Sequence, residues 1–429
     1  MKKKEYIKEI VRSFHTNDLP TIKPRELHIP ANSGKIVTLC GVRRCGKTYI
    51  MYQTIAELLS SGVDKTKIIY INFEDERLDL SIGELDLILQ SYRELYELDI
   101  KECYLFFDEI QNISGWEGFV RRIYDTLTKN IFITGSNAKL LSAEIATSLR
   151  GRNISYEVYP LSFSEYLSFI DFTPDMYNPN DKAKLKNIFM QFMKDGGFPE
   201  TLGMGADIRA NTLQGYFDVM IYRDIIERYD EKNSALLKYF IKRVLSTFTK
   251  AISINKIYNE LKSSGYKVGK NTLYQYFDYI ETIYLGFALR RYDPSMLKSE
   301  LSEKKSYLID NGLLLSVSFT FSDDYGKLLE NIVFLELKRS GKDIFYYKEK
   351  KECDFLVFDR DRVVEAIQVC YDMSDKDTRE REVAGLLEAC EALGLQRGAI
   401  VTLDEDDEFI QEGICVRLVG IGRYLLENK

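Results

Sequence analysis

The residues from Gly41 to Thr48 have the spacing of a loop that binds phosphate. An apolar stretch expected to form a buried strand precedes them, and a helix is expected over Thr48–Ser60. Backbone N–H groups of such a glycine-rich loop close around phosphate oxygens, and the helix N-terminus adds its positive end. Lys47 would reach the β- and γ-phosphates, and the Thr48 hydroxyl would bind Mg²⁺. A chance glycine-rich turn would lack the flanking strand and helix. The residues expected to bind nucleotide are Gly41, Arg43, Arg44, Cys45, Gly46, Lys47, Thr48 and Tyr49.

An acidic pair follows a second apolar strand. The strand is expected over Tyr104–Phe107, and Asp108 and Glu109 come directly after it. An aspartate at the carboxyl end of a strand can hold Mg²⁺ through water, and a neighbouring glutamate can polarise the attacking water. A strand that merely ends at solvent is the alternative, but the phosphate loop earlier in the chain favours chemistry. Asp108 is therefore a candidate metal ligand together with Thr48, and Glu109 is a candidate catalytic residue together with Lys47.

Two later segments offer further catalytic groups. The strand expected over Ile131–Thr134 is followed by Ser136 and Asn137, either of which can orient the lytic water or sense the γ-phosphate. Their alternative role is to cap a following helix. Arg150 and Arg152 each offer a guanidinium for transition-state charge, in the same subunit or from a neighbouring one. Their alternative role is a surface salt bridge.

The motif order indicates which nucleotide binds. One extra strand, Lys67–Phe73, lies between the two motifs, and Glu109 adjoins the metal-binding aspartate. This combination is typical of the P-loop class that inserts a strand and uses a catalytic glutamate, which consists mostly of ATPases. No NKxD-type motif for guanine follows the acidic pair. ATP with Mg²⁺ is therefore the expected ligand.

The elements that must position these residues alternate between strand and helix from 35 to 165. Such alternation predicts a mostly parallel α/β sheet, with helices also at Tyr6–Phe14, Leu80–Leu98 and Trp116–Thr128. From 163 to about 248 a helical period takes over, broken once at Gly196–Pro199. Residues 251–292 indicate three short helices and then a hairpin. The last part is expected to contain a helix (Lys327–Lys338), strands at Ile344–Lys348, Cys353–Phe358 and Val363–Cys370, a helix at Arg379–Leu393 and a closing strand at Gly398–Leu403.

Residues 251–300 carry the pattern of a helix-turn-helix. One helix is expected over Ser253–Leu261, a Ser-Ser-Gly turn follows, and a second helix is expected over Asn271–Leu285. In this layout the second helix can enter the major groove of duplex DNA. Asp278 and Glu281 on that helix favour the alternative, a winged helix used for packing or protein contact. The residues expected to contact DNA phosphates are Lys262, Lys267 and Lys270.

The C-terminal segment has the outline of a nuclease core that binds metal through a D…(E/D)-x-K pattern. Asp354 stands on one expected strand, but Gln368 and Cys370 occupy the positions of the second acid and the lysine on the next. A glutamine can offer a carbonyl to Mg²⁺, whereas a neutral cysteine cannot replace an ammonium. Glu330 and Glu365 are spare carboxylates. We expect a nuclease-like fold that serves in binding or assembly and does not cut.

The composition narrows the class of protein. The 429 residues carry a formal net charge of -7, which restricts any DNA contact to a local patch. No apolar run approaches the ~18–20 residues that span a bilayer, and no apolar segment follows the charged N-terminus. The seven cysteines are scattered without a CxxC, and both histidines precede the phosphate loop. These features predict a cytoplasmic protein with reduced thiols, without a membrane segment and without a histidine-based mechanism.

Several segments, taken in order, carry a resemblance to a known family. They are GVRRCGKT, FFDEIQNISGWE, ITGSN, LRGR, YPLSFSEY, GGFPE and YLIDNGLL, and they run from about residue 25 to residue 370. The chain resembles the large prokaryotic group of AAA-type ATP-binding proteins that have a C-terminal domain of unknown function. The resemblance implies the order ATPase core, helical lid, winged-helix region and nuclease-like fold. It also assigns Arg43 and Arg44 to the cradle, Gln111 and Trp116 to the segment after the acidic pair, and Gly197, Pro199 and Glu200 to the lid.

These patterns together predict an α/β protein built on a P-loop parallel sheet of AAA type. The expected regions are an N-terminal helix and connector (1–34), a P-loop ATPase core (35–165), a helical lid (166–250), a winged-helix-like region (251–300) and an inactive C-terminal domain of the α/β restriction-endonuclease type (301–429). We expect Mg²⁺-dependent ATP hydrolysis that drives a C-terminal module binding duplex DNA or a partner, either another protein or a further copy of the chain. An ATP-dependent nuclease and a non-hydrolysing, nucleotide-gated scaffold are the alternatives.

Overall fold

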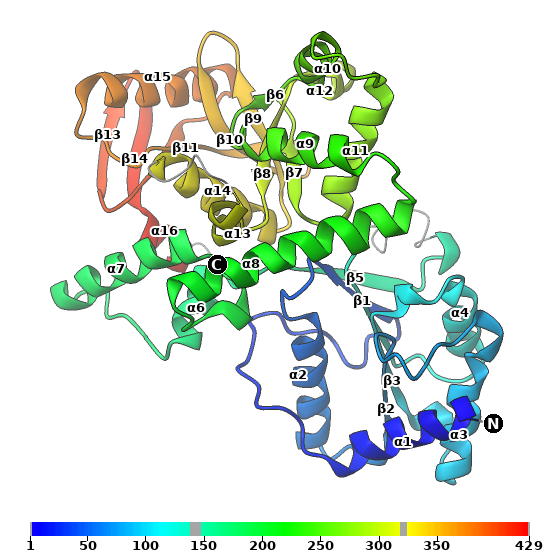
Figure 1. Ribbon diagram of the computed structural model, residues 1–429. Coiled ribbons are helices and arrows are strands. Elements are labelled where there is room, and N and C mark those ends of the chain that lie inside the picture. Colours follow the sequence, from blue (N-terminus) through cyan, green and yellow to red (C-terminus); the bar gives the residue numbers. More distant parts are fainter. Residues whose placement is uncertain (1, 138–146, 318–323, 428–429) are drawn as a thin grey trace. The chain divides into compact units, whose positions relative to one another are not determined.

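The fold comes from a computed structural model that describes residues 2–137, 147–317 and 324–427 (Figure 1). The chain forms two compact units, Met1–Val158 and Tyr159–Lys429. Among the helices of the described residues, none combines the length and the apolar character needed to cross a bilayer.

The first unit is built on a parallel sheet of five strands in the order β2-β3-β4-β1-β5. The strands are β1 (Ile36–Gly41), β2 (Ile68–Asn72), β3 (Tyr104–Asp108), β4 (Ile131–Gly135) and β5 (Asn153–Val158). β1, β3 and β4 are apolar and buried almost throughout, as expected for the centre of a parallel sheet. The sequence pattern indicates the first four strands. It does not indicate β5, whose residues are only partly buried.

The strand order brings the two motifs to one edge of this sheet. β4 lies between β1 and β3, whereas β2, the extra strand between the motifs in the sequence, takes the outer edge beside β3. Because the strands run parallel, the carboxyl ends of β1, β3 and β4 lie at the same edge. The phosphate loop, the acidic pair and Ser136 therefore leave the sheet side by side.

The helices of the first unit are α1 (Lys2–Thr16), α2 (Lys47–Ser60), α3 (Asp86–Leu95) and α4 (Trp116–Thr126). α3 is shorter than the helix expected over Leu80–Leu98. A capping box between Ser81 and Glu84 closes a separate 3₁₀ turn (Ile82–Glu84) before it, and the backbone becomes extended at Tyr96 after it. Further 3₁₀ turns are Lys65–Lys67, Ile100–Glu102 and Ile110–Asn112.

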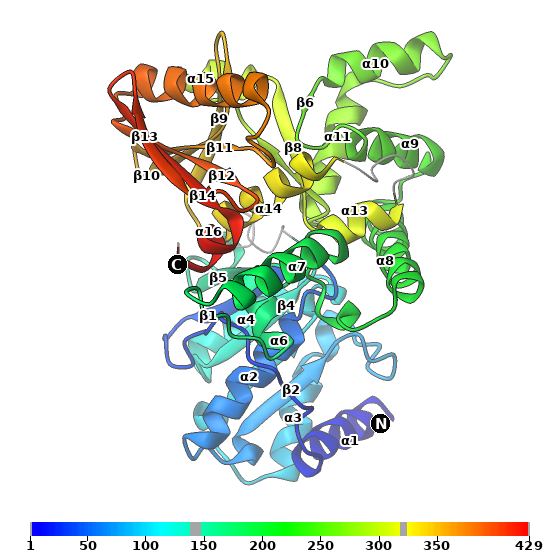
Figure 2. The same cartoon turned by 90° about the vertical axis from the view of Figure 1, so that its left-hand side faces the viewer.

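The second unit begins with a helical region, drawn in green in Figure 2. Its helices are α6 (Phe163–Phe169), α7 (Pro179–Asp195), α8 (Ala206–Ile221) and α9 (Ser234–Leu245). A 3₁₀ turn (Pro199–Thr201) follows the expected break after α7, and α8 continues into a π-helical segment (Tyr222–Glu227).

A small antiparallel sheet follows, with the strand order β6-β8-β7. Its elements are β6 (Ala251–Ile252), α10 (Ile254–Ser263), α11 (Lys270–Thr282), β7 (Gly286–Leu289), α12 (Met296–Leu301) and β8 (Lys304–Leu308). The expectation of three helices and a hairpin within 251–292 is wrong, because only two helices form there. The second strand of the hairpin is β8, beyond residue 300, and a local pattern does not reveal a partner so far along the chain.

The C-terminal part contains a mixed sheet of six strands in the order β13-β14-β12-β11-β10-β9. Its elements are α13 (Asn311–Val317), α14 (Tyr325–Arg339), β9 (Asp343–Lys348), β10 (Glu352–Asp359), β11 (Arg362–Val369), α15 (Lys376–Leu393), β12 (Arg397–Thr402), β13 (Asp407–Gln411), β14 (Ile414–Gly420) and α16 (Ile421–Glu427). The expectation that the strand at Gly398–Leu403 closes this part is wrong. β13 consists mostly of exposed residues and carries no apolar run, whereas β14 is apolar and largely buried, a signal that the expectation from the sequence missed.

Three segments of the second unit meet at a close backbone contact. Asp310, after β8, accepts a hydrogen bond from the backbone N–H of Gly197 at 2.7 Å. A Cβ on Gly197 would lie 2.5 Å from the carbonyl oxygen of Leu161, and one on Gly312 would lie 2.1 Å from that of Asp195. Only glycine fits at both positions. The segments YPLSFSEY, GGFPE and YLIDNGLL, which lie far apart in the sequence, therefore build one structural junction.

Candidate nucleotide site

The phosphate loop joins β1 to α2 and has little conformational freedom. Gly46, directly before α2, has a φ of 101°, a left-handed conformation that favours glycine. A Cβ on Gly41 would lie 2.1 Å from the carbonyl oxygen of Val158 on β5, which requires glycine at this position too. The buried Arg25 donates from Nη1 to the carbonyl oxygen of Cys45 at 2.7 Å. The loop is therefore held in shape by the chain itself.

Lys47 is the buried cation of the site. Its side chain is 4% exposed, and Nζ lies 3.6 Å from Oε1 of Glu109. Nζ also donates to the carbonyl oxygens of Gly41 at 3.1 Å and Val42 at 3.0 Å. Burial acts to lower the pKa of Lys47. The neighbouring acidic groups, Cys45 and Glu109 among them, have a larger opposite effect, so the pKa is raised. The ammonium is charged, and two of its partners are carbonyl oxygens that phosphate oxygens can replace.

Asp108, at the end of β3, accepts hydrogen bonds from three hydroxyl groups. Thr48 Oγ1 donates to its Oδ2 at 2.8 Å, the Tyr70 hydroxyl donates to the same atom at 2.9 Å, and Thr134 Oγ1 donates to Oδ1. Burial raises the pKa of Asp108, and the charge of Glu109 adds to this effect. Thr48 and Asp108 thus lie together, as residues that share one Mg²⁺ must.

Glu109 follows in a strained backbone conformation, with a φ of 53°. Its backbone N–H donates to Thr134 Oγ1 at 2.8 Å. Its carboxylate accepts from the Gln111 side-chain amide, which also donates to Ser136 Oγ at 3.4 Å. Burial acts to raise the pKa of Glu109, but the Lys47 charge and the Gln111 hydrogen bond outweigh it, and the pKa is lowered. Glu109 is therefore an anion, paired with Lys47.

The other residues of the expected set lie around this group. Arg43 pairs with Glu74 at 2.8 Å, Arg44 has a φ of 66°, and Tyr49 is 49% exposed. Cys45 is fully buried, as a small packing residue would be. Asn137 is buried next to Ser136 in the chain. The helix expected for either of them to cap falls in 138–146, outside the described residues.

The structure does not bring Arg152 into the group around Lys47. Its guanidinium donates to both carboxylate oxygens of Asp125 on α4, at 2.8 and 3.2 Å, and lies over the Tyr124 ring. This contact is the salt bridge that the sequence leaves as an alternative. Arg150 is exposed, with a φ of 49°.

The three lysines expected to contact DNA are exposed at one end of the α10–α11 pair. Lys262 stands near the end of α10, Lys267 in the turn and Lys270 at the start of α11. The Nζ atoms of Lys262 and Lys270 lie 6.0 and 5.3 Å from the centroid of the same ring, Tyr258. Lys262 and Lys270 therefore lie close together, and Lys267 stands between them in the chain.

Sequence reasoning misses Tyr70, Thr134 and Arg25. Tyr70 lies within an apolar strand, and only the pairing of β2 with β3 brings its hydroxyl to Asp108. Arg25 lies in the connector before β1, where no pattern points to the loop. Thr134 had a usable signal, because it is a polar residue near the carboxyl end of a buried strand, next to the candidate Ser136.

Three family profiles match the chain, and two of the matching relatives are at least 30% identical to it. Residues 33–167 match the AAA domain, and residues 186–324 and 325–422 match two domains of unknown function, DUF8612 and DUF4143. An uncharacterised protein of Methanocaldococcus jannaschii is 40% identical over 393 residues, which cover 90% of this chain and 85% of the relative. An uncharacterised protein of Haemophilus influenzae is 30% identical over 342 residues, which cover 79% of this chain and 83% of the relative. The chain belongs to the same family of AAA-type P-loop proteins as these two relatives.

The family membership fits the parallel sheet and the phosphate loop of the first unit. Among solved structures, the ORC1 protein of Aeropyrum pernix in complex with DNA has a TM-score of 0.33 and 14% identity, and covers 78% of this chain and 93% of its own. AMPPCP-bound DnaA from Aquifex aeolicus has a TM-score of 0.26 and 14% identity, and covers 66% and 88%. The AAA-type fold of this family supports nucleotide binding in the first unit.

Proposed function

We propose that the chain is a Mg²⁺-dependent ATPase. The proposal rests on the meeting of Lys47, Thr48, Asp108 and Glu109 at one edge of the parallel sheet. Thr48 and Asp108 would hold Mg²⁺, which when bound neutralises charge on the phosphates. Within the described residues, no group of three or more His, Cys, Asp or Glu side chains is arranged to hold a metal alone. This donor set suits an ion that binds together with substrate phosphates.

The Lys47–Glu109 pair supplies the proposed mechanism. Phosphate oxygens would replace the carbonyl oxygens of Gly41 and Val42 around Nζ and draw Lys47 away from Glu109. Losing this positive neighbour raises the proton affinity of Glu109, which makes it a better base toward the attacking water. Gln111 would keep the carboxylate oriented meanwhile, since it contacts both Glu109 and Ser136.

The test is Mg²⁺-dependent phosphate release from ATP by the full chain. We expect Lys47→Ala to lose nucleotide binding. Glu109→Gln should bind normally and lose ~100-fold or more in turnover, since a general base contributes about 10²–10⁴-fold. The fluorescence of Trp116, the single tryptophan, at the start of α4, reports binding in the same samples. Equal turnover by wild type and Glu109→Gln would contradict the proposal and favour a nucleotide-gated scaffold.

We propose further that the ATP cycle drives a module that binds duplex DNA through α10 and α11. The strand order β6-β8-β7 beside these two helices supports a winged-helix arrangement. Lys262, Lys267 and Lys270 offer phosphate contacts on a chain that is acidic overall.

Duplex DNA added to the same ATPase samples tests this coupling. DNA should raise the turnover of wild type at low salt, and the triple variant Lys262→Ala/Lys267→Ala/Lys270→Ala should lose this effect. The difference between the two proteins should shrink as the salt concentration rises, because salt weakens the phosphate contacts of wild type. A control triple removes three exposed lysines elsewhere, Lys182, Lys350 and Lys376. Equal stimulation of both triples, or none of wild type, would contradict DNA coupling and turn attention to a protein partner or a second copy of the chain.

Of the two arginines, Arg150 is the one we retain for transition-state charge, in the same subunit or from a neighbouring copy, because Arg152 is paired with Asp125. An ATP-dependent nuclease is not proposed. Gln368 donates to Glu382 and accepts from the backbone N–H of Asp354, and Cys370 donates to the carbonyl oxygen of Asp372. Both side chains are thus engaged by the chain itself.

A further inference from the structure

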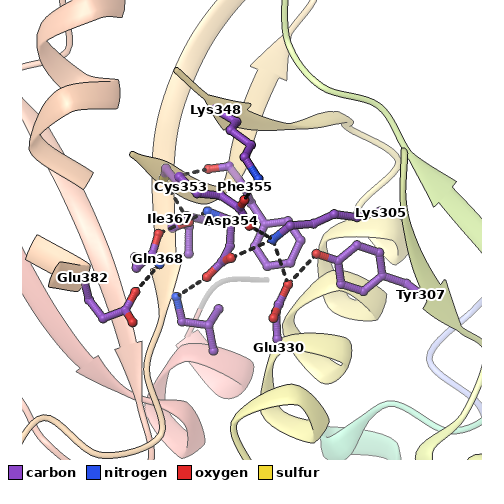
Figure 3. A network of polar contacts seen from close by, with 12 residues as sticks. Lys305, Tyr307, Glu330, Lys348, Cys353, Asp354, Phe355, Ile367, Gln368 and Glu382 are labelled. Carbon is purple, nitrogen blue, oxygen red and sulfur yellow. Dashed lines mark hydrogen bonds and ion pairs between the residues drawn. The ribbon is translucent and has the colours of Figure 1, made fainter. Parts of the chain in front are cut away.

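A buried lysine lies among three carboxylates in the second unit, two of which, Glu330 and Asp354, are labelled in Figure 3. The side chain of Lys305 is 4% exposed, and its Nζ lies 2.8 Å from Glu352, 2.9 Å from Asp354 and 3.3 Å from Glu330. We call these four residues the Lys305 site. An ammonium held by several carboxylate oxygens at such distances has the surroundings that a bound cation would have.

The cation and the acids of the Lys305 site come from different parts of the fold. Lys305 stands on β8, the central strand of the small sheet, opposite Ala251 of β6 and Leu289 of β7. Glu330 lies on α14, and Glu352 and Asp354 lie on β10 of the six-stranded sheet. The nuclease-like pattern expects a lysine at position 370, where this chain has a cysteine. Lys305, on a strand of another sheet, brings an ammonium to the acids instead, and no spacing rule in the sequence would find it.

Each of the three acids has a further contact within the chain. The Tyr307 hydroxyl donates to Glu330 at 2.6 Å, and the backbone N–H of Val369 donates to Asp354 Oδ2 at 3.1 Å. Lys348 pairs with Glu352 at 3.0 Å. The described residues contain no cluster of acids arranged to hold a metal here. The ammonium of Lys305 is therefore the cation that the three acids surround.

The protonation states of Lys305 and of the acids around it depend strongly on one another. Burial acts to lower the pKa of Lys305, but Glu330 and other neighbouring groups outweigh it and raise the pKa, so the ammonium stays charged. Burial raises the pKa of Glu330 to about 7, against the opposing charge of Lys305. Removing the ammonium would leave buried carboxylates with an uncompensated negative charge.

We propose that the Lys305 ammonium is the built-in cation of this carboxylate site, so that the site excludes divalent metal and fastens β8 to α14 and β10. On this basis the three carboxylates of α14 and β10 hold Lys305 and connect the two sheets, and they are not arranged around a metal ion while the ammonium is present. Removal of Lys305 should then create a divalent-cation site that the native chain lacks.

The test measures how much Mn²⁺ binds to the nucleotide-free full chain. Binding is detected as a decrease in the electron paramagnetic resonance signal of free Mn²⁺. The proteins are wild type, Lys305→Met, Lys305→Met/Asp354→Asn, Asp354→Asn and the control Lys304→Met, which changes the neighbouring lysine of β8. We expect Lys305→Met to bind one more Mn²⁺ per chain than wild type. The double variant and the control should match wild type, since any Mn²⁺ held elsewhere is common to all five.

Two results would overturn the proposal. One is a Mn²⁺ ion on wild type that Asp354→Asn removes, because the acids would then hold metal beside Lys305. The other is a folded Lys305→Met that gains no Mn²⁺. Should Lys305→Met be unfolded without metal by circular dichroism, refolding on addition of Mn²⁺ supports the proposal and failure to refold contradicts it.

Discussion

Lys47 and Lys305 are both buried ammonium groups beside carboxylates, but their remaining partners differ. Lys47 donates hydrogen bonds to the backbone carbonyl oxygens of Gly41 and Val42. A ligand can take the place of these two oxygens without leaving a charge unpaired. Lys305 is bound by three carboxylates, and displacing it would expose negative charge inside the protein. The same residue type thus serves an exchangeable site in one unit and a permanent contact in the other.

Tyr70 should tune metal use without taking part in the chemistry. Its hydroxyl donates to Asp108 Oδ2, the atom that also accepts from Thr48. We expect Tyr70→Phe to raise the Mg²⁺ concentration for half-maximal ATP turnover about tenfold or more, with maximal turnover nearly unchanged, because a hydrogen bond to a charged group is worth about 1.5–3 kcal/mol. Tyr104→Phe is the matched control, since that hydroxyl contacts Asn32 away from the site. An identical Mg²⁺ dependence in both variants would show that Tyr70 does not position Asp108.

Residues that act through local spacing are the ones that the sequence predicts. Lys47, Thr48, Asp108 and Glu109 follow directly from loop and strand-end patterns, and the structure brings them together. Tyr70 and Lys305 reach their partners only through sheet pairing and the packing of α14 on β8. Their neighbours in the sequence hold no information about those contacts, so a search for a lysine two positions after an acid on one strand passes over Lys305.

At the scale of elements, the most constrained place is the junction at Asp310. Its buried carboxylate accepts from the backbone N–H groups of Gly197 at 2.7 Å and Leu313 at 2.8 Å. Asn311, beside it, donates to the carbonyl oxygens of Met193 and Leu328. One short turn after β8 therefore ties α7, α13 and α14 together.

Asp310→Ala should destabilise the second unit by about 2–4 kcal/mol, because it leaves two buried backbone N–H groups without an acceptor. Urea unfolding followed by circular dichroism measures the loss. Asp324→Ala is the control, since that exposed carboxylate caps α14 and pairs with Lys327 at the surface, and its loss should cost about 1 kcal/mol. Equal losses in the two variants would mean that the junction contributes no more than an ordinary helix cap.

Most elements could be predicted from the sequence because their apolar periodicity is local. α2, β3, α14 and β10 agree closely with the expected ranges. β5 and β13 are missed because partly or fully exposed strands lack an apolar run. α3 is overestimated because a single 3₁₀ turn before it is too short to be told from a helical turn by its apolar residues, and because the backbone becomes extended at Tyr96.

For the molecule as a whole, Glu330 should make stability depend on pH. Burial raises its pKa from 4.5 to about 7, with the charge of Asp354 adding to the effect and Lys305 and the Tyr307 hydrogen bond opposing it. The folded chain therefore holds more protons than the unfolded chain between these values, and its unfolding free energy falls as pH rises through this window. Glu330→Gln removes this contribution, whereas Asp310, whose pKa burial raises to about 6, stays in both proteins.

Urea unfolding of wild type and Glu330→Gln at pH 5, 6, 7 and 8 checks this expectation. The stability of wild type should decline more steeply than that of the variant up to about pH 7, and the two slopes should become equal above it. Parallel curves over the whole range would show that folding does not change the proton affinity of Glu330.

The position of β8 has a practical consequence for dissecting the protein. The border between the two C-terminal profiles falls at residues 324 and 325, yet the Asn331 amide of α14 bonds to both backbone groups of Leu308 at the end of β8, at 2.8 and 3.0 Å. A fragment cut at this border would lose those bonds, and Lys305 would lose all three of its carboxylates at once. Expression trials that follow the profile border should therefore give insoluble or protease-sensitive halves. A fragment beginning near Tyr159 keeps every one of these contacts and is the one to clone.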